Sequence, residues 1–282
     1  MMQNTVASKK ESSASTAQSI NATPFRRYLT LLAVKLLKRI RKSRGPVIFL
    51  SSKICVKCGG QVTLNEASTM QFVAQHTSIP VPRVYCAFKR KGRVYIVMER
   101  IQGEPIGAGW YKRSEESKAK LLEQLKRMIE EMRSITPPEG VGVAHVNGGP
   151  LYAPRLPGTY LHSGPFSTIQ DFHSYLRFGI EAHPEHKPEI SELISRQEKV
   201  RDPPVFTHGD LSSFNILVSG DEIVGIIDWE TAGWYPSYWE YTSAWDVNPY
   251  NEFWRDEVGK FIQPMPEELE MERVRLEYFG DV

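Results

Sequence analysis

Apolar and polar positions alternate near the start of the chain and recur at helical spacing farther along. Between residues 45 and 98, two short apolar runs flank a pair of serines at 51–52. Two further runs, 84–88 and 94–98, flank a turn rich in Lys and Gly. Between these pairs, apolar residues at every third or fourth position after Thr63 indicate one helix. The order strand–strand–helix–strand–strand predicts a small antiparallel sheet with a single helix.

Downstream of residue 104 the apolar spacing becomes mainly helical, with one exception. Two apolar runs, 216–218 and 223–227, flank Gly220 and Asp221, which predicts a short β-hairpin. Together the two parts predict an α+β fold, in which a sheet-rich part precedes a mostly helical part. The predicted helices of the second part cover residues 117–133, 168–180, 188–198 and 264–279.

The N-terminal region divides into a polar and a basic segment. Residues 1–24 are rich in Ser, Thr, Ala and Asn and predict a disordered tail. In residues 25–44, leucines and other apolar residues are interleaved with eight Lys or Arg, a pattern that predicts a basic amphipathic helix. Such a helix either contacts a membrane surface or packs on its own domain with solvated basic side chains. We favour packing, and because only Glu11 is acidic before Glu66, organelle targeting stays open.

Composition excludes several classes of protein. The chain has 282 residues, with 35 basic and 33 acidic side chains, so no overall field favours nucleic acid as a partner. Its three cysteines indicate a reducing compartment, and we expect a cytoplasmic protein. Cys55 and Cys58 lie three positions apart on a predicted strand and face opposite sides, which argues against a zinc or redox pair. The sequence leaves the oligomeric state open.

The most informative stretch combines a tight loop with the predicted hairpin. Asp210 and Asn215 stand at the two ends of the loop, and Asp228 follows the return strand. The hairpin places the loop beside the end of that strand, so the three oxygen-bearing side chains converge. Asp and Asn also favour ordinary turns, but a turn does not require this combination. Hard oxygen donors in small number suit Mg²⁺ that shares its coordination with substrate phosphates.

The stretch resembles the kinase catalytic loop, in which His-x-Asp-x4-Asn precedes an Asp on the next hairpin strand. His-Gly-Asp at 208–210, Ile-Asp-Trp at 227–229 and the aromatic run 233–241 are similar to the aminoglycoside phosphotransferase and choline kinase-like superfamily. They are most similar to its fungal phosphotransferase branch, over about residues 45–245.

This resemblance implies a protein kinase-like two-lobed fold. A small antiparallel β-sheet with one helix would form the N-lobe, and a mostly helical C-lobe would carry the catalytic β-hairpin. The implied boundaries are residues 45–98 for the N-lobe, 99–103 for the hinge and 104–282 for the C-lobe.

The resemblance also implies a reaction that depends on ATP and Mg²⁺. The γ-phosphoryl group would move to a hydroxyl group of a small molecule, a transfer that needs alignment and charge neutralisation more than covalent chemistry. By the resemblance, Asp210 orients the acceptor hydroxyl and takes its proton, while Asn215 and Asp228 hold the metal. His208 is expected to pack behind the loop and not to act as a base.

In the N-lobe the resemblance assigns the nucleotide contacts. Lys57 would contact the α- and β-phosphates and pair with Glu66. The backbone at Met98, Glu99 and Ile101 would hydrogen-bond adenine. A simpler interpretation of Glu66 is a capping box at the start of its helix, and a lysine at a strand end is often only solvated.

One part of the family pattern is missing. No glycine-rich loop precedes Lys57, and only Gly45-Pro46 and Ser51-Ser52 stand in its place. We expect Ser51 and Ser52 to donate hydrogen bonds to phosphate instead. The missing loop keeps two alternatives open, a catalytically weak pseudokinase and a nucleotide-binding regulatory protein.

A protein kinase is disfavoured because parts of its signature are absent. Only 54 residues follow Asp228, no Ala-Pro-Glu motif occurs, and Gly209 replaces the arginine that would read a phosphorylated loop. The acceptor is not specified by these residues. One hypothesis is that Glu230, Glu240 and Asp246 receive a cationic alcohol.

Overall fold

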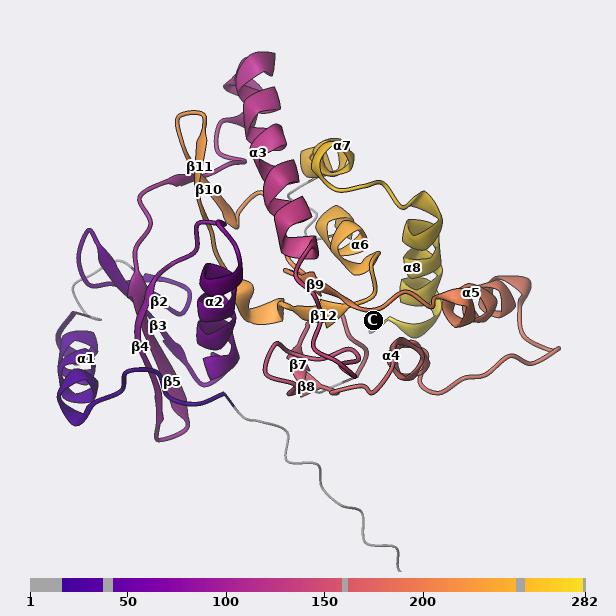
Figure 1. The fold of residues 1–282 in the computed structure, drawn as a ribbon, viewed down its shortest axis with the longest axis horizontal. Coiled ribbons are helices and arrows are strands. Elements are labelled where there is room, and N and C mark those ends of the chain that lie inside the picture. Colours follow the sequence, from indigo (N-terminus) through magenta and orange to yellow (C-terminus); the bar gives the residue numbers. More distant parts are fainter. Residues whose placement is uncertain (1–16, 38–42, 159–161, 247–251, 281–282) are drawn as a thin grey trace, which may run out of the picture.

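The computed structural model describes residues 17–37, 43–158, 162–246 and 252–280. The first part of the chain forms a five-stranded antiparallel sheet in the order β1-β2-β3-β5-β4 (Figure 1). Its strands are β1 (Ser43–Arg44), β2 (Val47–Phe49), β3 (Ile54–Gly59), β4 (Val84–Arg90) and β5 (Arg93–Glu99). The predicted strands and their order are thus present, with the short β1 added at one edge.

Both predicted turns are present, and their residues adopt the hydrogen bonds and backbone angles of tight turns. The Ser51 Oγ accepts hydrogen bonds from the Lys53 and Ile54 N–H groups, each at 3.1 Å, and holds the turn between β2 and β3. Lys91 and Gly92 have φ of 48° and 73°, the left-handed pair that suits a tight hairpin between β4 and β5.

Each face of the sheet is covered by one helix. Figure 1 shows α1 (Pro24–Leu37) and α2 (Leu64–His76) on opposite sides of the strands. In β3, Cys55 belongs to the apolar cluster on the α2 side, and Cys58 to a small cluster that Val34 of α1 packs against. The two thiols therefore face opposite ways, as predicted.

The N-terminal segment differs from the prediction in its bounds. Ile20 and Ala87 exchange backbone hydrogen bonds of 2.8 and 2.9 Å, so the end of the expected tail pairs with the edge strand β4. Helix α1 ends at Leu37, and Ser43–Arg44 form a strand where a helix was expected. Val34 of α1 packs on the sheet, so the helix lies on its own domain as favoured, and this packing does not test contact with a membrane surface. Residues 1–16 and 38–42 lie outside the described residues.

The rest of the chain forms a mostly helical lobe. Its helices are α3 (Glu115–Arg133), α4 (Ile169–Leu176), α5 (Pro188–Lys199), α6 (Trp239–Asp246), α7 (Glu252–Phe261) and α8 (Pro266–Phe279). Helix α4 is shorter than predicted because Phe178 and Gly179 adopt positive φ, which ends a helix. Helices α6 and α7 were not predicted. None of the helices in the described ranges is long and apolar enough to cross a membrane.

Short strands within this lobe position the predicted site. Strands β10 (Ile216–Ser219) and β11 (Glu222–Ile226) form the expected hairpin, and β6 (Glu104–Pro105) joins it as a third strand. The fold is thus mixed, with a small antiparallel sheet and a helical part, as predicted. The remaining short elements are η1 (Trp110–Lys112), β7 (Leu151–Tyr152), β8 (His162–Ser163), β9 (Val205–Thr207), η2 (Trp229–Thr231) and β12 (Gly233–Tyr235).

Aromatic side chains fill the core behind the hairpin. Trp229, Trp234, Tyr235, Tyr238 and Trp239 are at most 1% exposed. They stack or meet edge to face, as with Tyr235 and Trp239, whose ring centroids are 5.4 Å apart. The aromatic run after Asp228 is therefore core, and it forms the rigid support on which the loop of Asp210 rests.

Candidate active site

A cleft of about 1600 Å³ lies between the five-stranded sheet and the β10–β11 hairpin. Strands β2, β3 and β5 line one side with Val47, Lys57 and Met98. Phe214, Leu217 and Asp228 line the other side. A cavity of this size, lined by apolar residues with a few charged groups, is typical of a ligand-binding site.

Lys57 is the charged centre of the cleft. Its side chain leaves β3 on the α2 side, and its Nζ lies 2.8 Å from Glu66 Oε2, 2.7 Å from Asp228 Oδ1 and 2.8 Å from Glu230 Oε2. Only 5% of Lys57 is exposed. One ammonium group thus joins helix α2 of the first lobe to the segment after β11 in the second.

Glu66 does not form the capping box that was its simpler interpretation. Thr63 is the N-cap of α2, but its side chain makes no capping hydrogen bond. The Glu66 side chain turns instead into the cleft, where it is 2% exposed and pairs with Lys57. The contact with Lys57 joins two opposite charges in a buried site, whereas a capping bond joins the carboxylate to an uncharged N–H, which explains the choice.

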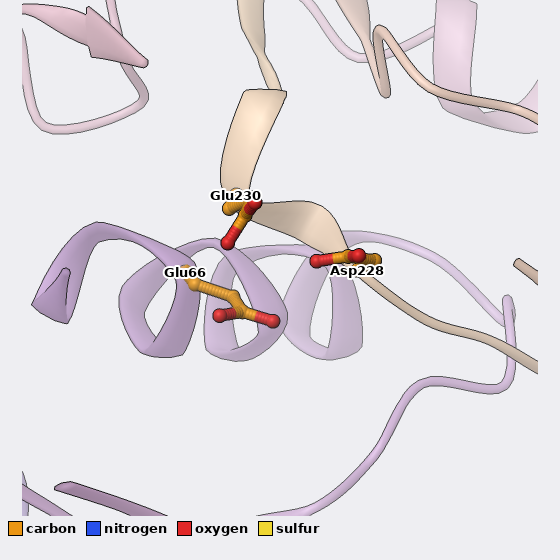
Figure 2. A group of neighbouring side chains, drawn as sticks. All are labelled: Glu66, Asp228 and Glu230. Atoms are coloured by element: carbon orange, nitrogen blue, oxygen red, sulfur yellow. The ribbon is translucent and has the colours of Figure 1, made fainter. Parts of the chain in front are cut away.

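Three carboxylates surround Lys57, whereas the resemblance implied one partner, Glu66. Oxygens of Glu66, Asp228 and Glu230 lie within 4.8 Å of one another, and Figure 2 shows all three side chains converging. Burial favours the neutral amine of Lys57, but the three carboxylates outweigh it and raise its pKa. Burial raises the pKa of Glu66, although Lys57 opposes the shift. The cluster carries more negative than positive charge and is suited to a further cation.

Sequence reasoning missed Glu230 as a member of this cluster. Asp228 has φ of 65° and ψ of 56°, and the short helix η2 follows immediately. This sharp turn buries Trp229 completely, while Asp228 and Glu230 on either side of it reach the cleft. The signal in the sequence was the spacing Asp-Trp-Glu, in which a buried aromatic separates two acids.

Asp210 and Asn215 lie in direct contact. The Asn215 Nδ2 donates hydrogen bonds to the backbone oxygen and to the Oδ2 of Asp210, both at 2.8 Å. The Ile227 N–H donates to the Asn215 backbone oxygen at 2.9 Å, which joins the loop to the residue before Asp228. The hairpin thus brings the loop to the strand end as predicted. Because its amide nitrogen faces Asp210, the Oδ1 of Asn215 is left as an acceptor or metal ligand.

The carboxyl group of Asp210 is strongly perturbed. Burial, and next the negative charge of Asp228, raise its pKa to about 7, although the Asn215 hydrogen bond opposes the shift. A carboxyl group with a pKa near neutrality can take a proton and give it up again under ordinary conditions.

His208 supports the loop from behind. Its Nδ1 accepts a hydrogen bond from the Asp210 N–H at 3.2 Å, so Nε2 carries the proton and donates to the Ile227 oxygen at 3.1 Å. Burial lowers the pKa of His208 to about 4, so the ring is neutral at pH 7. The expectation that His208 packs behind the loop is confirmed.

Glu240 holds the same loop from the opposite side. Its two carboxylate oxygens accept hydrogen bonds from the His208 N–H at 2.6 Å and the Gly209 N–H at 3.1 Å. Gly209 has φ of +80°, and a Cβ there would lie 3.2 Å from the Thr231 oxygen, so this position needs glycine.

The hypothesis of a site for a cationic alcohol is therefore not supported by these acids. Glu240 is completely buried and both of its oxygens are occupied. Glu230 contacts Lys57, and Asp246 lies 3.6 Å from Arg155 and 3.9 Å from Arg255. Each of the three charges already faces donors within the protein.

Replacing Glu240 with glutamine is expected to lower the free energy of unfolding by about 2 kcal/mol. The amide keeps one acceptor but turns an N–H₂ group toward one of the two buried N–H groups of the loop. Urea unfolding measures the change, with Glu277→Gln on the exposed face of α8 as the matched control. Equal unfolding midpoints for the two variants would contradict this role of Glu240.

The predicted adenine contacts lie at the end of β5. Met98, Glu99 and Ile101 all line the cleft. The Glu99 N–H donates to the Arg83 oxygen at 2.9 Å and is occupied, and its carbonyl receives the Cys55 thiol at 3.6 Å. Among the described residues, none accepts a hydrogen bond from the Ile101 N–H. The Ile101 N–H is thus an unoccupied backbone donor of this segment.

The role predicted for Ser51 and Ser52 is wrong in position. Val47 pairs with Lys57 and Phe49 with Cys55, so the turn between β2 and β3 lies at the opposite end of these strands from Lys57. The Ser51 carbonyl accepts a hydrogen bond from Arg100 at 3.3 Å, beside the segment that connects the lobes. The short turn at Gly45 and Pro46 is the one that stands over Lys57, and Pro46 lines the cleft.

Comparison with known proteins agrees with this geometry. The model of the phosphotransferase enzyme family, APH, matches residues 61–272, most of the chain. The chain belongs to this family. It is therefore a phosphotransferase, and the resemblance to aminoglycoside phosphotransferases is confirmed, whereas the fungal branch stays a prediction. The matched range starts and ends later than the predicted 45–245 and leaves out the strand of Lys57.

Solved structures of aminoglycoside phosphotransferases share the fold. A thermostable mutant of APH(4)-Ia, in a ternary complex with ADP and hygromycin B, is 14% identical, with 89% of this chain and 88% of that chain covered and a TM-score of 0.60. The streptomycin–ATP–APH(2'')-IIa ternary complex is 15% identical, with 89% and 86% covered and a TM-score of 0.55. ADP-bound APH(2'')-Ib is 18% identical, with 86% and 85% covered and a TM-score of 0.54.

A sequence search of curated proteins returns no significant match. At these low identities the solved structures establish the two-lobed, kinase-like fold and nothing finer. The fold class predicted from the sequence is therefore confirmed. The roles of individual residues depend on the geometry of the cleft.

Proposed function

We propose that this phosphotransferase transfers the γ-phosphoryl group of ATP to a hydroxyl group of a small molecule. The observation that carries the proposal is that charged residues of the two lobes contact each other across one cleft. Lys57 and Glu66 from the first lobe meet Asp228, which follows the hairpin that bears the Asp210–Asn215 pair. Charge neutralisation and an aligned base are the two requirements of phosphoryl transfer.

ATP is the proposed phosphoryl donor. Related structures of the same fold were solved with ADP and with ATP. In this chain the Glu99 carbonyl and the Ile101 N–H offer adenine one acceptor and one donor at the cleft wall. Lys57, which keeps its charge because its pKa is raised, would contact the α- and β-phosphates.

The donor set of the cleft fits Mg²⁺. The groups available are carboxylate oxygens of Asp228 and Glu230 and the Oδ1 of Asn215, and Mg²⁺ prefers such oxygen ligands. We assign Asn215 and Asp228 as the residues that would hold it and add Glu230 as a further candidate. When bound, the metal neutralises charge on the phosphates.

Asp210 is the proposed base. Its Oδ2 is held by the Asn215 amide, and the buried loop is fixed by His208 and Glu240, so the carboxylate is oriented before the acceptor arrives. It would align the acceptor hydroxyl and take its proton as the phosphoryl group is transferred. The three buried thiols fit a reducing compartment such as the cytoplasm, our proposed location.

The rate of transfer is expected to fall as the pH drops below about 7. Asp210 must be ionised to accept a proton, and its pKa is raised to about 7 by burial and by Asp228. The acceptor kcat/KM should therefore rise through this pH and level off above it. Initial rates between about pH 5 and pH 9 at saturating ATP test this. A flat profile over that range would argue against Asp210 as the base.

A screen of hydroxylated metabolites for ATP-dependent gain of one phosphate group tests the function. The expected result is one class of alcohol that gains phosphate, with no product from the Asp210→Asn variant. The turn at Gly45 and Pro46 is short, and the strand β1 before it has only 2 residues. This observation favours a weak or regulatory kinase as the second candidate. ATP binding without any phosphorylated product would support that candidate.

A further inference from the structure

Helix α1 presents its bulky apolar side chains to solvent. Half of the large exposed apolar residues in the described part of the chain lie on this one helix. They are Phe25 (69% exposed), Tyr28 (64%), Leu29 (45%), Leu32 (39%) and Leu36 (58%). A contiguous exposed apolar surface of this kind marks an interaction site more often than scattered single residues do.

These five residues, which we call the α1 stripe, share one face of the helix. At about 3.6 residues per turn their spacing confines them to an arc of about 100°. The opposite face carries Thr30, which is 7% exposed, and Val34, which packs against the outer cluster of the sheet. The stripe therefore points away from the lobe.

The lobe side of α1 uses arginines where a surface helix normally uses apolar residues. The Arg26 guanidinium donates to the Tyr85 oxygen at 3.3 Å, and the Arg27 guanidinium lies 5.6 Å from the centre of the Phe88 ring. Both arginines remain exposed, as the prediction of solvated basic side chains requires. The helix is held on the sheet by these two contacts and by Val34, and it leaves the α1 stripe uncovered.

Charge in the stretch of sequence that contains the α1 stripe is of one sign. The sequence has no acidic residue between Glu11 and Glu66, whereas residues 26–44 include eight Lys or Arg. Lys35 is exposed on α1 itself, and five of the eight follow Leu37. A second copy of this chain would bring an equally basic segment to the stripe, so self-association through α1 is opposed by repulsion.

We propose that the α1 stripe docks on the surface of an anionic lipid bilayer. The helix has 14 residues, about 21 Å at 1.5 Å per residue, which is too short to cross a hydrocarbon core of about 30 Å. It would lie in the plane of the interface with the stripe inserted, while the basic residues face the lipid phosphates and carboxylates. The proposal does not depend on the chemistry of the cleft.

Docking in this way leaves the cleft accessible. Figure 1 shows α1 and α2 on opposite sides of the sheet, and Lys57 leaves β3 on the α2 side. A membrane that touches the α1 stripe therefore lies behind the sheet as seen from the cleft. Nucleotide and acceptor would still enter from solution.

Co-sedimentation of the full chain with vesicles tests the proposal. Vesicles of phosphatidylcholine with phosphatidylserine should bind the protein. The affinity for vesicles of phosphatidylcholine alone should be lower by about tenfold or more. The double variant Leu32→Gln with Leu36→Gln should weaken binding to the anionic vesicles by about tenfold or more. The matched control is Phe178→Gln with Ile180→Gln, two residues 60% and 40% exposed in the other lobe, which should bind like the wild type.

A fluorescent label locates the contact. Because Cys55, Cys58 and Cys86 are buried, a Tyr28→Cys variant offers one accessible thiol among the described residues for an environment-sensitive dye. Its emission should shift to the blue with anionic vesicles and return when salt is raised.

Three results would overturn the proposal. They are absence of binding to the anionic vesicles, equal binding by the Leu32→Gln, Leu36→Gln variant, and a wild-type dimer in sedimentation that this variant abolishes. The last would assign the stripe to a second copy. Unfolding midpoints equal to the wild type show that the variants fold.

Discussion

Replacing Asp210 with asparagine is expected to lower kcat for phosphoryl transfer by about 10³-fold. The amide keeps the size of the side chain and its contact with Asn215, but it cannot take a proton from the acceptor. Because Lys57 and the end of β5 are untouched, ATP affinity should be unchanged. Initial rates and ATP titration calorimetry measure the two effects, with the exposed Asp256→Asn as the matched control.

The same substitution is expected to stabilise the protein at high pH. Because the folded-state pKa of Asp210 is raised to about 7, above an unfolded value of about 3.9, the folded protein keeps a proton that the unfolded chain loses. That contribution is complete below about pH 4 and is lost as the pH rises through 7. Asparagine does not titrate. The free energy of unfolding of the variant, relative to that of the wild type, should therefore rise by about 1–2 kcal/mol from about pH 5 to pH 8.

Either of two outcomes would contradict the role of Asp210. One is a variant that retains more than about a tenth of the wild-type kcat, since a positioned base contributes about 10²-fold or more. The other is loss of ATP binding, which would make Asp210 a structural residue of the nucleotide site.

Replacing Lys57 with methionine is expected to lower the free energy of unfolding by about 3 kcal/mol at pH 8 and to abolish measurable ATP binding. The substitution removes the single ammonium group that lies within 2.8 Å of Glu66, Asp228 and Glu230. Three carboxylates, one of them buried, then face one another without a cation. Urea unfolding and ATP titration are the measurements.

The pH dependence distinguishes this mechanism from a packing defect. Burial, and the negative charges of Asp228 and Glu230, raise the folded-state pKa of Glu66 above its unfolded value, so the variant regains stability as Glu66 takes up a proton. The deficit should therefore shrink from pH 8 to about pH 5, and adding Glu66→Gln should recover part of it. The control Lys53→Met changes an exposed lysine next to the same strand. A deficit independent of pH would contradict the proposed repulsion.

The loop and hairpin of the second lobe were predictable because their residues are close in sequence. Asp210 and Asn215 close one tight loop, and a single hairpin separates Asn215 from Asp228. Short-range turn chemistry is enough to bring them together. Lys57 lies 171 residues from Asp228, and its place opposite that residue followed only from the family resemblance.

Two residues that do not line the cleft illustrate where pattern reasoning failed. Ser51 was recognised as a turn residue, but the pattern does not say which end of the β2–β3 pair faces the phosphates. Glu240 was treated as a possible contact for a cationic alcohol, although it is 0% exposed and binds two backbone N–H groups of a loop more than 30 residues away. Both errors concern partners that are distant in the sequence.

The class of reaction followed from the family resemblance. The sequence pattern by itself determined the order of strands and helix between residues 45 and 98 and the hairpin with its three oxygen-bearing side chains. These features depend on periodicity and turn chemistry, which act over a few residues. The tertiary structure alone decided that Glu230 shares Lys57, that Glu240 holds the loop, and that α1 turns its apolar face to solvent. The physical reason is that burial and charge pairing depend on the surface an element meets, and that surface comes from distant parts of the chain.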